Sequence, residues 1–272
     1  MKRPRSLGLR TDLIFFGGDH PDDGRIEDRA DHLVLSTPRN PTFYWGNFLL
    51  FEAPPAVGDG ERWESLFREA FTDQSQATHR AYAWDGTSGE RGAANEELAG
   101  FEVFDLSVLT CSDPVDPGVS GIEVRALEGD EDWRLALELQ IEGRDPCHAP
   151  ATYNPFKTNQ MAAYRRLAER GRGAWYGAFI EGRMVADLGI FTDGQGLGRY
   201  QAVETQRDFR RRGVARTLVH RAGRAALERA DVETLVIVAD ADGGPRRVYE
   251  AVGFREVERQ VAANRWEGMP GA

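Results

Sequence analysis

Apolar positions in the second half of the chain recur first at strand and then at helical spacing. Residues 122–127 are typical of a strand. Trp133, Leu137 and Ile141 follow at intervals of four residues, which predicts a helix over 132–141. This half of the chain therefore opens with a strand and an amphipathic helix.

The same alternation continues to the end of the chain. A loop over residues 144–155 precedes a second helix through Met161, Tyr164 and Leu167. Three strand-like runs, a long helix, an apolar strand, a short helix and a last strand come next. They cover residues 174–180, 184–191, 199–205, 214–230, 235–239, 245–251 and the segment from 254. This order predicts an α/β domain with a mixed (α+β) sheet.

The first half is less regular. An aromatic and apolar run at residues 42–52 predicts one or two strands, and Trp63 and Phe67 belong to a short amphipathic helix. Two further strands are expected at 79–84 and 101–110, and a loop or a short helix start at 87–97. These elements predict a smaller α+β domain.

A run of turn formers and prolines separates the two halves. The sequence S-D-P-V-D-P-G at residues 112–118 suits neither a helix nor a central strand. We therefore expect a first domain over residues 1–112, a linker over 113–118 and a second domain over 119–272.

Charge and cysteine content restrict the class of protein. The 272 residues carry 34 Lys and Arg against 44 Asp and Glu, a formal net charge of −10. This balance argues against a nucleic-acid binder. It is explained by solubility alone, or by attraction of a cationic substrate such as an amine. Two cysteines are too few for a disulfide framework, and the apolar run at 13–16 is too short for a signal peptide or a membrane span. We expect a cytoplasmic protein with no membrane partner.

A candidate phosphate site precedes the long helix. A helix N-terminus presents unpaired N–H groups and partial positive charge. Gly213 and Ala215 allow a close approach to the backbone there, and Arg210, Arg211 and Arg212 add positive charge. This pattern predicts a phosphate-bearing cofactor, and the alternative is a solvated basic turn. The spacing matches neither G-x-x-x-x-G-K-[ST] nor G-x-G-x-x-G.

Two motifs in this half resemble those of a known family. The sequence RRRGVA at 210–215 is similar to the [QR]-x-x-G-x-[GA] signature of the GNAT superfamily, and RVYEAVGF at 247–254 resembles the family's LYeklGF ending. The resemblance spans about residues 122–266. Four positions depart from it, because Arg207 replaces a frequent proline, Arg211 a glycine, Asp242 an asparagine and Pro245 an alanine.

The resemblance implies an acetyltransferase that uses acetyl-coenzyme A as co-substrate. The loop would hold the coenzyme A pyrophosphate through residues that are contiguous in sequence: Arg210, Arg211, Arg212, Gly213, Val214 and Ala215. The backbone of Val203 and Thr205 would pair with the pantetheine arm like an added strand. Asp242 would place a negative charge near the coenzyme.

The resemblance also implies direct attack by an amine on the thioester in a ternary complex. The amine must lose a proton at neutral pH. Strand alternation places Tyr200, Ala202 and Glu204 on one face, and Glu204 is our hypothesis for the base or its water-holding partner. It is equally compatible with an exposed strand-end glutamate. By resemblance, Tyr249 is the general acid for the leaving thiolate, and the alternative is a tyrosine that packs the core.

The acceptor pocket is expected in the loop over 144–155, with His148 and Tyr153 as contacts. Cys147 adjoins His148, but no third ligand is spaced near them, so no metal site is predicted. The order Leu-Ala-Gly-Phe that ends at Phe101 echoes the segment that ends at Phe254. This echo suggests a degenerate GNAT-like first domain that cannot hold coenzyme A, and an unrelated α+β domain is the alternative.

The sequence thus predicts an N-acetyltransferase that acts on a primary amine of a small molecule or peptide, as a monomer or homodimer. The alternatives are an acyltransferase that uses another acyl-CoA, and a sensor or scaffold that binds coenzyme A without turnover.

Overall fold

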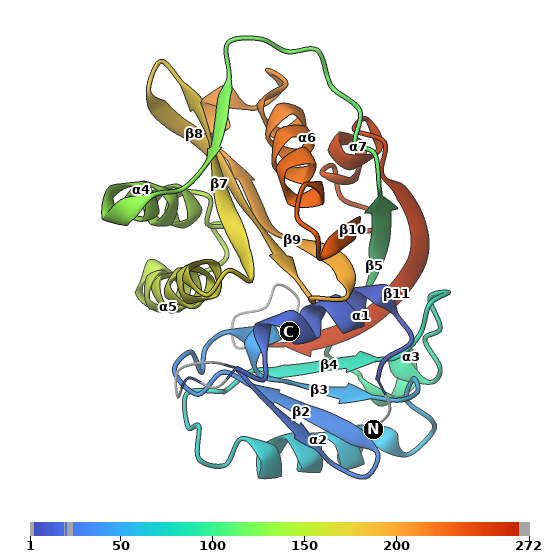
Figure 1. Cartoon of the computed structure of the whole chain (residues 1–272). Helices are drawn as coiled ribbons and strands as arrows, with labels where there is room; N and C mark the ends of the chain where they lie inside the picture. Colours follow the sequence, from blue (N-terminus) through green and yellow to red (C-terminus); the bar gives the residue numbers. More distant parts are fainter. Residues whose placement is uncertain (1–2, 19, 21–23, 267–272) are drawn as a thin grey trace. The chain divides into compact units, whose positions relative to one another are not determined.

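The computed structural model describes residues 3–18, 20 and 24–266 (Figure 1). The described chain divides into two compact units. Unit 1 comprises the residues up to Ser107 together with those from Glu258 onward, and unit 2 comprises Val108–Val257. Among the described residues, none of the helices combines the length and the apolar character that a membrane span requires.

Unit 2 is a mixed sheet with helices on both faces. Its strand order is β5-β10-β9-β8-β7-β6, in which β6 to β9 pair antiparallel and β9 and β10 pair parallel. The strands are β5 (Glu102–Cys111, which ends in this unit), β6 (Glu123–Ala126), β7 (Gly173–Ile180), β8 (Arg183–Thr192), β9 (Gly196–Thr205) and β10 (Val232–Asp240). The mixed sheet that the apolar pattern predicts is confirmed.

Four helices belong to this unit: α4 (Gly129–Glu142), α5 (Pro150–Glu169), α6 (Val214–Leu227) and α7 (Arg246–Glu250). Figure 1 shows α4 and α5 on one side of the strands and α6 on the other. The expected loop over 144–155 is wrong from Pro150 onward, because α5 begins there. Proline suits the first turn of a helix, where its missing N–H needs no partner, and Pro155 is accommodated inside the helix.

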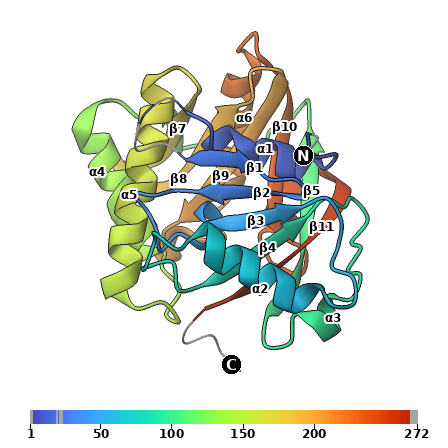
Figure 2. The same ribbon diagram turned by 90° about the horizontal axis from the view of Figure 1, so that it is seen from below.

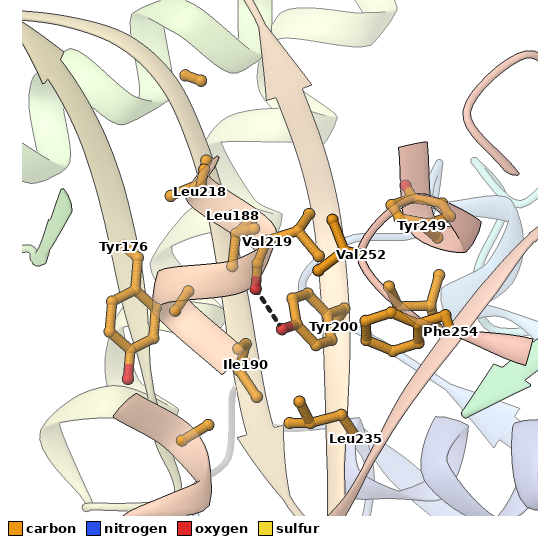
Figure 3. Packing of buried hydrophobic residues seen from close by; sticks show 14 of the residues in the cluster. Tyr176, Leu188, Ile190, Tyr200, Leu218, Val219, Leu235, Tyr249, Val252 and Phe254 are labelled. Atoms are coloured by element: carbon orange, nitrogen blue, oxygen red, sulfur yellow. Dashed lines mark hydrogen bonds between the residues drawn. The ribbon is translucent and has the colours of Figure 1, made fainter. Parts of the chain in front are cut away.

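The core of unit 2 lies between the sheet and α6 (Figure 3). Tyr200 is buried there, and its hydroxyl donates a 2.7 Å hydrogen bond to the carbonyl of Val219 on α6. Gly223 permits this approach, because a methyl group at its position would lie 2.3 Å from the Tyr200 hydroxyl oxygen. Phe254 packs edge-to-face on the Tyr200 ring and so joins the last strand to the same core.

A β-bulge interrupts β9. Asp187 pairs with Glu204, but Gly189 pairs with Gln201, so one residue of β8 faces two of β9. Ala202, at the bulge, has φ +46°, a conformation that costs free energy in a residue with a side chain. The predicted common face of Tyr200 and Glu204 is therefore wrong, because the extra residue shifts the alternation and brings Glu204 onto the side of Asp187.

Unit 1 is a second, smaller α+β arrangement. Its strand order is β1-β2-β3-β4-β11, for β1 (Arg25–Asp28), β2 (His32–Ser36), β3 (Phe48–Phe51), β4 (Arg80–Trp84) and β11 (Arg255–Arg265, which enters this unit at Glu258). Helix α2 (Asp59–Ala70) connects the parallel strands β3 and β4, and Figure 2 shows it lying across them. Trp63 and Phe67 bury this helix against the sheet, as their spacing predicts.

The first 36 residues hold elements that the apolar pattern did not predict. Helix α1 (Leu7–Asp12) is capped by Ser6, whose side-chain hydroxyl accepts from the N–H of Leu9. Strands β1 and β2 follow, and β1 is exposed throughout, so it has no apolar alternation to recognise. In the aromatic run at 42–52, only β3 is a strand, since Tyr44–Gly46 forms a turn of 3-10 helix.

The two units repeat one order of elements. In unit 1, β3 is followed by Gly58, α2, β4, α3 (Ala94–Glu97) and Gly100; in unit 2, β9 is followed by Gly213, α6, β10, α7 and Gly253. All four glycines have a positive φ, at 91°, 82°, 81° and 98° for Gly58, Gly100, Gly213 and Gly253. The last strand is β5 in the first repeat and β11 in the second. Because β11 ends beside β4, its residues from Glu258 group with unit 1, whereas the division by sequence had assigned them to the second domain.

Candidate active site

Strands β9 and β10 pair only over the first half of their length. Their pairing runs from Gly196 and Val232 to Arg199 and Val236, yet β9 continues to Thr205 and β10 to Asp240. Within the described residues, the second half of β9 therefore has one edge that β10 does not cover. An edge of this kind offers main-chain groups to an extended ligand. Val203 and Thr205, the residues expected to meet the pantetheine arm, lie on this stretch.

The basic loop leads directly from β9 into α6. Arg211 and Gly213 both have a positive φ, at 61° and 81°, and Gly213 is the N-cap residue of α6 with no side-chain cap. A methyl group on Gly213 would lie 2.7 Å from Cγ2 of Val119. The position where Arg211 replaces the family's glycine thus has the conformation that favours glycine. The loop turns tightly and presents the uncapped first turn of the helix, which includes Val214 and Ala215.

Glu204 lies at the end of β9, beside this loop. Its Oε1 accepts from the backbone N–H of Thr205 at 2.8 Å and from Nη2 of Arg210 at 3.1 Å. Its Oε2 lies against the last turn of α4, because a methyl group on Gly143 would be only 2.4 Å away. The carboxylate is therefore held between the basic loop and α4 rather than extended into solvent.

Tyr249 on α7 is buried in the core of unit 2 near Phe254 (Figure 3). Burial, and then the negative charge of Glu204, raise the pKa of Tyr249 to about 12. Its hydroxyl keeps its proton throughout the neutral range. This state suits a proton donor, and it suits a packed core tyrosine equally well.

The expected acceptor residues lie near one another. The rings of His148 and Tyr153 stack with centroids 6.0 Å apart. The Tyr153 hydroxyl donates to the carbonyl of Gln140 at 3.4 Å, and burial followed by the charge of Glu204 raises the pKa of Tyr153. Cys147 is exposed, and the described residues contain no group of three metal-ligating side chains. The structure thus brings His148 and Tyr153 together, and the charge of Glu204 acts on Tyr153.

Asp242 is exposed just beyond the end of β10. Its backbone N–H donates to Oδ1 of Asp240 at 3.0 Å, which closes a turn before α7. The structure gives its side chain no described contact with the basic loop. A role beside the coenzyme stays a prediction.

Comparisons with known proteins agree with this geometry. Residues 146–270 match the model of the acetyltransferase (GNAT) domain family. The chain therefore carries a GNAT acetyltransferase domain. Such a domain belongs to the acyltransferases and generally binds an acyl-CoA. No curated protein matches the sequence.

Three solved structures extend the likeness to both units. A functionally unknown conserved protein from Staphylococcus epidermidis ATCC 12228 has 12% identity and a TM-score of 0.69, covering 91% of this chain and 96% of its own. A GCN5-related N-acetyltransferase from Kribbella flavida has 14% identity and a TM-score of 0.63, with 92% and 90% covered. A tandem GNAT protein from the clavulanic acid biosynthesis pathway has 16% identity and a TM-score of 0.56, with 100% and 92% covered. At these identities the likeness concerns the fold, and it agrees with two GNAT-like units.

A buried polar cluster that was not predicted from the sequence lies beside the bulge of β9. Asp187 on β8 is fully buried and accepts from Nε1 of Trp175 at 2.9 Å. Gln140 on α4 and Lys157 on α5 are also buried. Burial raises the pKa of Asp187 to about 7 and lowers that of Lys157 to about 8. One signal was available, since Asp187 interrupts the apolar run M-V-A-D-L-G-I-F.

We expect Asp187 to make the stability of the protein depend on pH. Its pKa is higher in the folded chain than in the unfolded chain, so its contribution is fully present below about pH 4 and is lost as the pH rises through 7. Asp187→Asn removes this titration. Chemical unfolding at pH 4.5, 6 and 8 should show a smaller decline between pH 4.5 and 8 for the variant than for the wild type. Equal declines would contradict the assignment.

Proposed function

We propose that the protein is an N-acetyltransferase that transfers the acetyl group of acetyl-coenzyme A to a primary amine. The observation that carries the proposal is the turn formed by Arg211 and Gly213. This turn leaves the N-terminus of α6 without a side-chain cap, and it follows the part of β9 that β10 does not cover, which we call the free edge of β9. Three arginines, Arg210 to Arg212, line a turn in a protein of net charge −10. These features fit a diphosphate followed by an extended arm.

The residues of the loop and strand divide the binding between them. The N–H groups of the first turn of α6, at Val214 and Ala215, and the arginines Arg211 and Arg212 would hold the pyrophosphate. Arg210 already bonds to Glu204 and to the Thr205 carbonyl, so its role is to fix the loop on β9. The main chain of Val203 and the second lone pair of the Thr205 carbonyl would hold the pantetheine arm, because the Thr205 N–H already donates to Glu204.

Two side chains are proposed to move protons. Glu204 takes a proton from the ammonium group of the acceptor, directly or through water, and frees the nitrogen lone pair that forms the new C–N bond. When the C–S bond breaks, the Tyr249 hydroxyl gives its proton to the departing sulfur, and the tyrosinate regains a proton, through water, from the second proton that the nitrogen loses as it becomes an amide. Tyr153, on which the charge of Glu204 acts, and His148, which stacks on it, would contact the acceptor.

Unit 1 is proposed not to bind coenzyme A. Gly58 is the N-cap residue of α2 just as Gly213 is that of α6, but the first N–H groups at the start of α2 are occupied. The Glu97 carboxylate accepts from the N–H of Gly58 at 2.8 Å and from that of Gly60 at 2.9 Å. Asp59 and Glu61 add negative charge to the same turn. A carboxylate of the chain itself thus stands where a phosphate would have to bind.

A screen for released thiol tests the proposed reaction. The protein is incubated with acetyl-CoA, propionyl-CoA or a long-chain acyl-CoA and a panel of amino sugars, polyamines, amino acids and peptides. Amine-dependent thiol release that is fastest with acetyl-CoA supports the proposal. Faster release with another donor identifies a different acyltransferase, and tight binding without turnover indicates a sensor or scaffold.

Glu204→Gln is expected to lower kcat/KM for the amine by about 10²-fold at neutral pH, because the amide cannot accept the proton. The loss should shrink at high pH, where more of the amine is already neutral. A pH profile of kcat/KM on wild type and variant measures both effects. Glu142→Gln, at the exposed end of α4, is the control. An unchanged profile in Glu204→Gln would remove this residue from the reaction.

A further inference from the structure

The bulge of β9 has a strained residue at its centre. Ala202 adopts φ +46°, which costs a non-glycine residue on the order of 1 kcal/mol or more. Such a conformation persists only when its surroundings hold it. The residues that follow it on β9 are Val203, Glu204 and Thr205, which the proposed reaction uses. Whatever fixes Ala202 therefore also fixes the direction of these groups.

One side chain makes a direct bond to this bulge. Nε2 of Gln140, on α4, donates to the carbonyl oxygen of Ala202 at 2.7 Å and to Oδ1 of Asp187 at 2.7 Å. Both bonds are short, and Gln140 is 4% exposed. Because Asp187 pairs with Glu204 across β8 and β9, the same amide joins both strands at the bulge.

Neighbouring groups fix the orientation of the Gln140 amide. Nζ of Lys157 can only donate, and it lies 3.4 Å from Oε1 of Gln140 and 2.8 Å from Oε1 of Gln160. The Ala202 carbonyl can only accept. If the amide flipped, its oxygen would face the Ala202 carbonyl oxygen and its NH2 group would face the Lys157 ammonium group. Burial makes such unpaired contacts costly.

We propose that Gln140, held by Asp187 and Lys157, is a positioning residue that keeps the bulge of β9 in place and so directs Glu204 and the free edge of β9 toward the thioester. This inference rests on the proposed acetyl transfer. Gln140 itself touches no reacting atom. It acts on the rate through the backbone at Ala202, and it does not contact the loop that begins α6.

The test compares Gln140→Leu, the double variant Gln140→Leu with Ala202→Gly, and the control Glu138→Gln on the exposed face of the same helix. Gln140→Leu should lower kcat about tenfold or more with KM for acetyl-CoA within about threefold, because misplaced groups slow the reaction more than they weaken cofactor binding. Glycine adopts a positive φ without strain, so Ala202→Gly should restore most of the lost kcat. Glu138→Gln should behave as the wild type.

Hydrogen exchange provides a readout that does not depend on activity. Amides of residues 202–205 should exchange faster in Gln140→Leu than in the wild type or Glu138→Gln, and Gln140→Met replaces Gln140→Leu if the latter does not fold. A wild-type kcat, or a loss that Ala202→Gly leaves unchanged, overturns the proposal. If the wild type shows no turnover with any amine, the proposed function fails. The positioning role of Gln140 is then judged by exchange alone, and unchanged exchange at residues 202–205 in Gln140→Leu overturns it.

Discussion

Gly213→Asp is expected to weaken acetyl-CoA binding at least about 100-fold. Three effects of this change act together. Its carboxylate stands at the helix N-terminus and repels the pyrophosphate. Its Cβ would meet Val119 at 2.7 Å, and the left-handed backbone at φ +81° adds strain. Isothermal titration of acetyl-CoA into wild type and variant measures the loss, and we expect micromolar affinity in the wild type.

The control for this experiment is Gly171→Asp. Gly171 also has a positive φ, at 71°, but open space surrounds it after the end of α5. Gly171→Asp adds the same charge and a similar backbone strain away from the basic loop, so acetyl-CoA binding should be retained. The stoichiometry should be one acetyl-CoA per chain, because Glu97 occupies the helix start in unit 1. Equal affinity in Gly213→Asp would show that the ligand binds elsewhere.

The sequence predicted the elements that carry strong periodic signals. Helix α6 begins at the predicted residue and ends three residues before the predicted end, and strand β10 contains the predicted strand and extends it by three residues at the start and one at the end. Strand β1 has no apolar residue on a buried face, so its place depends on pairing with β2. Pairing between distant segments leaves no local periodicity. For the same reason, the entry of β11 into unit 1 could not be predicted.

The candidate site shows the same limit at the level of single residues. The turn at Arg211 and Gly213 follows from local sequence, because glycine and short-range backbone geometry determine it. The face of Glu204 does not, because a single extra residue at Ala202 reverses the alternation. Gln140 also carried no signal in the sequence, since its importance comes from contacts with residues 47 and 62 positions away.

Tyr249→Phe is expected to lower kcat by about 10²-fold while the thermal unfolding temperature changes little. The change removes only the hydroxyl, so the departing sulfur loses its proton donor. The ring still fills its place in the core beside Phe254. The pKa of about 12 means that the hydroxyl is protonated over the whole assay range, so the loss should be similar from pH 6 to 9. Initial rates from pH 6 to 9 measure kcat, and thermal unfolding measures the stability.

Tyr200→Phe is the matched control, because it removes another tyrosine hydroxyl from the same core. That hydroxyl donates to the Val219 carbonyl, so its loss should lower the stability by about 1 kcal/mol and leave kcat near the wild-type value. The two variants are thus expected to differ in opposite ways. Tyr249→Phe lowers kcat and keeps the stability, whereas Tyr200→Phe lowers the stability and keeps kcat. If Tyr249→Phe instead keeps its kcat, Tyr249 is a packing residue of α7, and the sulfur must take its proton from another donor or from water.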